Sequence, residues 1–137
     1  MEVTMAVDVD AAAIASARPG SEPERKRFRD QFAAYVPYVV LNPDGMIRDV
    51  TPSARKLLEY RTSQQIDPCF FAHVHGKNLY QVMRDVADMV CYGKNQASWL
   101  LRLRTGQGRW RWYKASVRNR LEEDEAIQIQ LDDQSAW

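Results

Sequence analysis

Three segments in the second half of the chain alternate between apolar and polar residues. In one of them, Trp99, Leu101 and Leu103 alternate with Leu100 and two arginines. Successive side chains of a strand point to opposite faces of its sheet, so a period of two is typical of strands. Turn-forming residues separate the segments. The pattern predicts three strands, at residues 99–104, 109–117 and 127–131.

The first half of the chain combines a hairpin with two helices. Residues 38–50 are predicted to form the hairpin, because Asn-Pro-Asp-Gly at 42–45 is a strong turn sequence between two short apolar runs. Thr51 and Pro52 suit the cap and first position of a helix. Apolar residues then recur at helical spacing over residues 79–92, and Gly93 ends that helix. Short turns and helices are expected at 62–78. This order of elements indicates an α+β fold.

The N-terminal part has a different character. Residues 1–20 are interpreted as a mobile tail, and residues 21–36 as an amphipathic helix that begins with a capping box. The sheet carries apolar residues on both faces, for example Leu100 as well as Leu101. The internal helices cover one face, so we expect the N-terminal helix to cover the other, in its own chain or together with a second copy. A homodimer is expected, with these interface residues: Phe28, Phe32, Tyr35 and Val36.

Composition narrows the class of protein. The 137 residues are 45% hydrophobic and include 4 Trp, 6 Tyr and 4 Phe, which indicates a folded domain rather than a disordered chain. The net charge of +1 argues against binding driven mainly by nucleic acid phosphates. No apolar stretch approaches the length of a membrane span. The two cysteines, Cys69 and Cys91, are interpreted as reduced thiols in a cytoplasmic protein.

Five motifs in a fixed order resemble the PAS domain, a sensor and interaction module of signalling proteins. The resemblance covers residues 37–134, with Thr51, Glu59 and Asp67 standing where the family usually has Asn, Gly and Gly. It implies a five-stranded antiparallel sheet in the order 2-1-5-4-3, with the helices of residues 52–92 on one face and an N-terminal flanking helix on or near the other. The motifs are Asn42–Ile47, Thr51–Tyr60, Phe70–His75, Arg102–Trp112 and Asp132–Gln134.

A PAS fold can hold a cofactor between its sheet and its long helix. Flavin-binding LOV members use a cysteine, and Cys69 lies near that region, but the Asn, Arg and Gln that would hold the flavin are missing. Haem-binding members use a histidine of the long helix, and residues 79–92 contain none. We therefore predict no cofactor, with flavin and haem disfavoured and a small apolar ligand left open.

Catalytic and metal sites have little support in the sequence. Cys69 and His73 are four residues apart and could form a thiolate dyad or half a metal site, but no third ligand or orienting group has matching spacing. His75 is better explained as a helix cap or turn residue. No enzyme motif is present, so neither catalysis nor a metal site is expected.

Residues 109–114 combine arginine with aromatic side chains, opposite Arg102 and Arg104. Such a run could stack single-stranded bases. Cross-strand and cation–π pairs explain it as well, and the balanced net charge favours that structural role. No nucleic acid partner is expected.

Two functions remain open. One is a sensory domain that binds a small molecule and passes a population shift to an effector domain or partner protein. The other is a dimerisation or protein-interaction module with a filled core. An enzyme that uses Cys69 or His75 is a third alternative with weaker support. Residues 135–137 are expected to begin a linker to an output domain in a longer signalling protein. The candidate ligand contacts are Val40, Leu57, Phe70, Phe71, Leu79, Met83, Trp99, Leu101, Trp112 and Gln128.

Overall fold

The computed structural model describes residues 2–3, 5–6 and 36–134. The chain divides into two compact units, Met1–Ala33 and Ala34–Trp137. Within the first unit, β1 (Glu2–Val3) and β2 (Met5–Ala6) form a short parallel pair. The tail beyond these strands, most of the predicted helix at 21–36 and residues 135–137 lie outside the described residues, as do Phe28, Phe32 and Tyr35.

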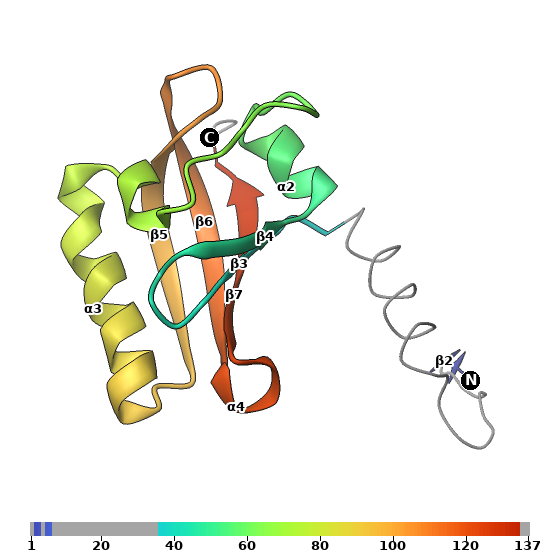
Figure 1. Ribbon diagram of the computed structural model, residues 1–137, viewed down its shortest axis with the longest axis vertical. Helices are drawn as coiled ribbons and strands as arrows, with labels where there is room; N and C mark the ends of the chain where they lie inside the picture. The colour runs from blue at the N-terminus through green and yellow to red at the C-terminus, as the bar shows by residue number, and fades with distance from the viewer. Residues whose placement is uncertain (1, 4, 7–35, 135–137) are drawn as a thin grey trace. The chain divides into compact units, whose positions relative to one another are not determined.

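The second unit is built on one five-stranded antiparallel sheet (Figure 1). Its strand order, β4-β3-β7-β6-β5, is the predicted order 2-1-5-4-3, and the α+β class is confirmed. The ends of the three long strands differ from the predicted ends by up to three residues, because backbone pairing and not side-chain alternation determines where a strand ends. The strands are β3 (Tyr38–Leu41), β4 (Ile47–Val50), β5 (Gln96–Arg104), β6 (Trp110–Arg120) and β7 (Ala126–Asp133).

Within residues 36–134, four helical segments connect the strands. Thr51 caps α2 (Pro52–Leu57) as predicted, and Gly93 ends α3 (Gly76–Tyr92) in the left-handed conformation. The helix α3 begins three residues before the predicted start at 79, because the His75 ring accepts a hydrogen bond from the Lys77 N–H and caps it. The other two segments are η1 (Phe70–His73) and α4 (Leu121–Asp124).

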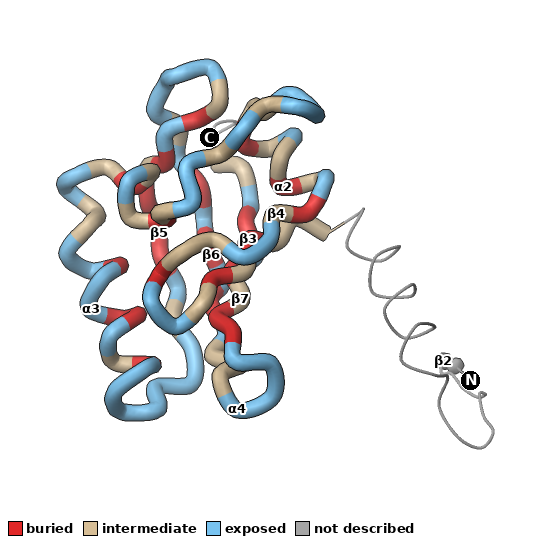
Figure 2. Tube along the Cα trace, viewed as in Figure 1, coloured by how far each residue is buried: buried red, intermediate tan, exposed pale blue. Residues whose placement is uncertain are grey.

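The core lies between the sheet and the segments α2, η1 and α3 (Figure 2). Strands β3, β5 and β6 contribute alternate residues to it, so Val39 and Leu41 are buried whereas Tyr38 and Val40 are only partly so. The same alternation buries Tyr113, Ala115 and Val117 of β6. Along α3, Val82, Val86 and Met89 face the core at helical spacing. We call the side of the sheet that faces this core its inner face, and the opposite side its outer face.

The first hairpin depends on one glycine. Gly45 has φ +85, and a Cβ at this position would lie 2.4 Å from an atom of the Phe71 ring. A side chain is therefore excluded both by the backbone conformation and by the aromatic ring that packs on the turn. Asp44 completes the turn by accepting a hydrogen bond from the Met46 N–H at 3.0 Å.

Candidate binding surfaces

Side chains leave little space in the interior, and an open pocket of about 90 Å³ at the edge between α3 and β5 is also smaller than a typical ligand site. The sequence-predicted residues Phe70, Trp99 and Leu101 are buried in the interior, and Leu57, Phe71 and Leu79 pack against the same core in part. A cavity with a volume of about 20 Å³ remains, lined by apolar residues that include Val39, Phe70 and Leu103. By this measure a cavity needs roughly 10–15 Å³ to hold one water molecule, so the space is about the size of one water and far below that of a ligand.

The other predicted ligand contacts do not reach this interior. Val40, Trp112 and Gln128 lie on the outer face, because each is an odd number of positions from a buried residue of its own strand. Met83 is 46% exposed, because it lies about 100° round the helix from buried Val82. The expectation that Met83 converges with Phe70 and Trp99 between the helices and the sheet was therefore wrong.

One polar group of the core was missed in the sequence. The carboxylate of Asp85 on α3 accepts hydrogen bonds from the Trp99 indole at 2.7 Å and from the Lys94 ammonium at 2.9 Å. Burial raises the pKa of Asp85, but these two donors outweigh burial, so its pKa lies below the usual value. An acidic residue within the apolar stripe of α3 was the signal that could have revealed this contact.

The backbone of Cys69 and the ring of His73 have structural partners. The Cys69 N–H donates to the Asp67 carboxylate at 2.9 Å, and Cys69 and Cys91 are both free thiols. His73 lies 2.8 Å from the Asp67 carbonyl oxygen through Nε2 and 3.4 Å from the Tyr60 hydroxyl through Nδ1. Among residues 36–134, no three acidic, cysteine or histidine side chains gather as a metal-ligand cluster would.

Two positions that depart from the PAS pattern are held by specific contacts. Thr51, in place of Asn, accepts a hydrogen bond from the Tyr38 N–H at 2.9 Å and donates one to the Val36 carbonyl at 2.8 Å. Glu59, in place of Gly, has φ 64 in the left-handed region. Its backbone strain is offset by charged hydrogen bonds from two arginines.

Glu59 lies at the centre of an ionic network. Arg109 forms a two-pronged pair with its carboxylate, and Arg111 donates to the same carboxylate at 2.8 Å and to Asp133 at 2.6 Å. The hydrogen bond from Arg109 is the main reason that the pKa of Glu59 falls to about 2. The network joins the end of α2 to the β5–β6 hairpin and to the last residue of β7.

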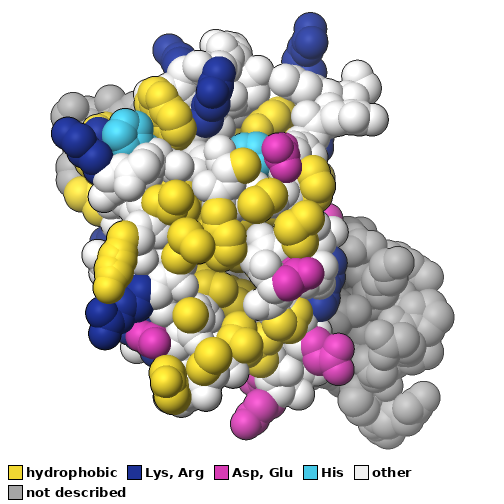
Figure 3. Space-filling view, turned by 60° about the vertical axis from the view of Figure 1, so that its left-hand side comes forward, with side chains coloured by type: hydrophobic (Ala, Val, Ile, Leu, Met, Phe, Trp, Pro, Cys, Tyr) yellow, Lys and Arg dark blue, Asp and Glu magenta, His cyan; other side chains and the backbone are white. Residues whose placement is uncertain are grey.

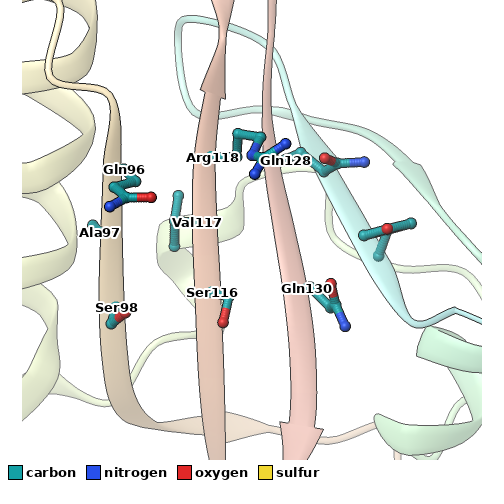
Figure 4. Close-up of a pocket in the computed structure, with 9 residues that line it drawn as sticks. Gln96, Ala97, Ser98, Ser116, Val117, Arg118, Gln128 and Gln130 are labelled. Carbon is teal, nitrogen blue, oxygen red and sulfur yellow. The ribbon is translucent and has the colours of Figure 1, made fainter.

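One half of the outer face is polar. Figure 4 shows two cross-strand rows, Gln96–Arg118–Gln128 and Ser98–Ser116–Gln130, which the strand register places side by side. Together with Tyr38 they line an open concavity of about 540 Å³. We call these seven residues, the two rows and Tyr38, the polar half. Their side chains carry hydroxyl, amide and guanidinium groups and no carboxylate.

The other half of the outer face combines aromatic and basic side chains. Leu100, Trp110 and Trp112 are 52%, 45% and 42% exposed. The Arg102 guanidinium lies over its cross-strand partner Trp112, 4.6 Å from the ring centroid, a cation–π pair of the general kind that the sequence favoured for this run. We call this set the aromatic–cationic half; its members are Leu100, Arg102, Arg104, Trp110, Trp112 and Lys114.

A further apolar surface lies on α3. Seen from the side where this helix lies, hydrophobic side chains run down the middle of the face and most charged groups lie toward its margins (Figure 3). The large exposed apolar residues of α3 are Tyr80, Met83, Val90 and Tyr92. Among the described residues, no helix combines the length and apolar character that a membrane-spanning helix requires.

Comparisons with known proteins identify the fold. No protein-family model matches the sequence, and the search of curated proteins finds no match. A PAS domain from Colwellia psychrerythraea superimposes with a TM-score of 0.67 at 16% identity, over 82% of this chain and 98% of that one. A sensory box histidine kinase/response regulator from Burkholderia thailandensis gives 0.59 at 16% identity, over 82% and 86% of the two chains.

A third similar structure is the LOV domain of a blue-light activated histidine kinase from Erythrobacter litoralis. It gives a TM-score of 0.58 at 7% identity, over 74% of this chain and 97% of that one. At such identities the likeness shows the fold alone. It agrees with the strand order and with the motifs in the sequence, and the chain therefore has the PAS fold.

Proposed function

We propose that the chain is a dimerising protein-interaction module of a signalling protein, with a filled core and no catalytic role of its own. The observation that carries this proposal is the interior cavity of about 20 Å³. Pockets for small molecules typically have volumes of about 300–1,000 Å³. A module with so little internal space acts through its surfaces, on an effector domain or partner protein in the cytoplasm.

The similar structures support the signalling part of the proposal. The Burkholderia protein is a sensory box histidine kinase/response regulator, and the Erythrobacter domain belongs to a histidine kinase. Sensing of a small apolar molecule remains the second candidate function for this chain. It would require the side chains around Phe70 and Leu103 to move apart, since the present cavity admits no ligand.

Native and denaturing mass spectrometry of the purified protein separate these two functions. A filled core predicts the same protomer mass under both conditions, and no visible absorption band. A co-purifying molecule that is released on denaturation would contradict the filled core and establish ligand binding.

The dimer is tested through the predicted N-terminal helix. We expect light scattering at micromolar concentration to show a dimer, and the double variant Phe28→Ser/Phe32→Ser to be a monomer, because the apolar stripe loses both of its phenylalanine side chains. The matched control is Lys26→Ser/Asp30→Ser, which changes the opposite side of the same predicted helix. A wild-type monomer over this concentration range would contradict the dimer.

A further inference from the structure

We infer that the aromatic–cationic half of the outer face binds an acidic segment of a partner protein that also carries apolar side chains. The inference rests on the proposed function as an interaction module and names the chemistry of one partner. It is carried by the preorganisation of Arg102, by the unbalanced charge of this half and by its exposed apolar side chains.

Arg102 is held in place before any partner arrives. Its backbone N–H donates to the Asn78 Oδ1 at 2.9 Å, and its Nε donates to the same oxygen at 3.3 Å. The guanidinium also lies over Trp112 at 4.6 Å from the centroid. These contacts fix the side chain, so little entropy is lost on binding, and its two terminal NH₂ groups remain for a carboxylate.

The charge of this half is unbalanced. Arg102, Arg104 and Lys114 form no ion pair with any of the described residues. The register pairs Arg102 with Trp112 and Leu100 with Lys114, so Arg102 and Lys114 occupy diagonal positions, whose backbones are about 7–8 Å apart in a typical antiparallel pair. The nearest cross-strand carboxylate is that of Asp132, opposite Lys114. Three cations beside one acid favour a partner with several carboxylates.

The same half offers apolar contacts. Leu100, Trp110 and Trp112 are each more than two-fifths exposed and surround Arg102 on adjacent strands. Trp and Arg are the side chains that most often dominate binding energy at protein interfaces. A helix or extended segment with Leu or similar residues between its acidic groups would match both features.

Two other occupants fit less well. Arg102 already covers Trp112, and the Trp110 ring contacts the His75 ring at 4.9 Å, so neither indole is a free platform for a nucleic acid base. Residues 21–36 of the chain contain four basic and three acidic residues, so this segment brings no acidic excess.

Fluorescence anisotropy on the full chain tests the inference with a labelled peptide of about 15 residues, composed of Glu, Leu and Ala with a helical period. We expect binding that weakens with added salt. Arg102→Gln should reduce the affinity about tenfold and Lys114→Gln about threefold, since each removes one charge contact. Arg118→Gln, on the polar half, is the matched control and should change the affinity less than about twofold.

Indole NMR signals locate the peptide. The Trp110 and Trp112 signals should shift on binding, whereas Trp99, which donates to Asp85 in the core, should not. Equal binding of the same peptide with Lys for Glu, tighter binding of an oligothymidine, or an equal loss in Arg118→Gln would overturn the inference. Failure of the acidic peptide to bind would also overturn it, and would leave the dimer measured by light scattering unaffected.

Discussion

The two faces of the sheet differ in what determines their side chains. On the inner face, every strand presents apolar residues that pack against α2 and α3. On the outer face, neighbouring strands present glutamine, serine, arginine and tryptophan in two distinct halves. Leu100 and Leu101 are adjacent in sequence, yet they are 52% and 1% exposed. The same residue type therefore has a different role on each face.

This contrast separates fold from function. The inner face is constrained by the space between the sheet and the helices, and its alternation is visible in the sequence. The outer face is not constrained by packing within the described unit, so its residue types reflect solubility or recognition. Variants on the inner face should therefore alter the free energy of unfolding, and variants on the outer face should alter binding.

The largest expected effect compares the two adjacent leucines. Leu101→Ala should lower the free energy of unfolding by about 2–5 kcal/mol, because it leaves a cavity in a packed core. Leu100→Ala should change it by less than about 0.5 kcal/mol, as is usual for exposed positions. Urea unfolding followed by circular dichroism measures both. Equal losses in the two variants would contradict the distinction between the faces.

The next effect concerns the polar contact beneath the inner face. Asp85→Ala should cost about 2–3 kcal/mol, because the buried Trp99 indole loses its acceptor. Asp85→Asn should cost less, since its side-chain oxygen can still accept from the indole. Lys94→Ala is the control for the charge alone, and its cost should be below about 1 kcal/mol because this lysine is partly exposed. Equal unfolding free energies for wild type and Asp85→Ala would contradict this role.

The sequence predicted the inner face well and the candidate site poorly, for physical reasons. Strand order and turns follow from local patterns such as residues 42–45 and from motif order. The helix α3, however, has apolar residues at Val82, Val86 and Met89 and also at Tyr80, Met83 and Val90. Both sets have helical spacing, so the pattern alone does not decide which faces the core, and Met83 was assigned to the wrong side.

Contacts between distant residues were harder to predict than elements. Glu59 and Arg109 are 50 positions apart, and only the fold brings their charges together. The unusual Glu in place of Gly was the sole local signal. In contrast, Arg102 and Trp112 lie across one hairpin, so counting outward from the turn at 105–108 could have paired them, although this pair was not predicted. Whether side chains fill the core or leave a ligand cavity depends on how their volumes fit together in three dimensions. The sequence alone does not determine this.

The Glu59 network predicts a moderate, pH-dependent effect. The pKa of Glu59 is about 2 in the folded protein, whereas an unperturbed glutamate has a pKa of 4.5. Because the folded pKa is the lower one, the stabilisation is complete above about pH 4.5 and is lost as the pH falls toward about 2. Glu59→Gln should cost about 1–2 kcal/mol at neutral pH through weaker hydrogen bonds. The free energy of unfolding of the Glu59→Gln variant should fall less steeply with decreasing pH than that of wild type. Parallel acid profiles would contradict the role of this carboxylate.

The smallest expected effect extends the comparison to the two cysteines. Cys91 is exposed, two positions from buried Met89 on α3, whereas Cys69 is half-buried where its N–H contacts Asp67. Cys91→Ser should change the free energy of unfolding by less than about 0.5 kcal/mol, and Cys69→Ser by less than about 1 kcal/mol. A thiol reagent should label Cys91 faster, since its sulfur meets solvent directly. Faster labelling of Cys69 would mean that the η1 segment opens more readily than its contacts with Gly45 and Asp67 indicate.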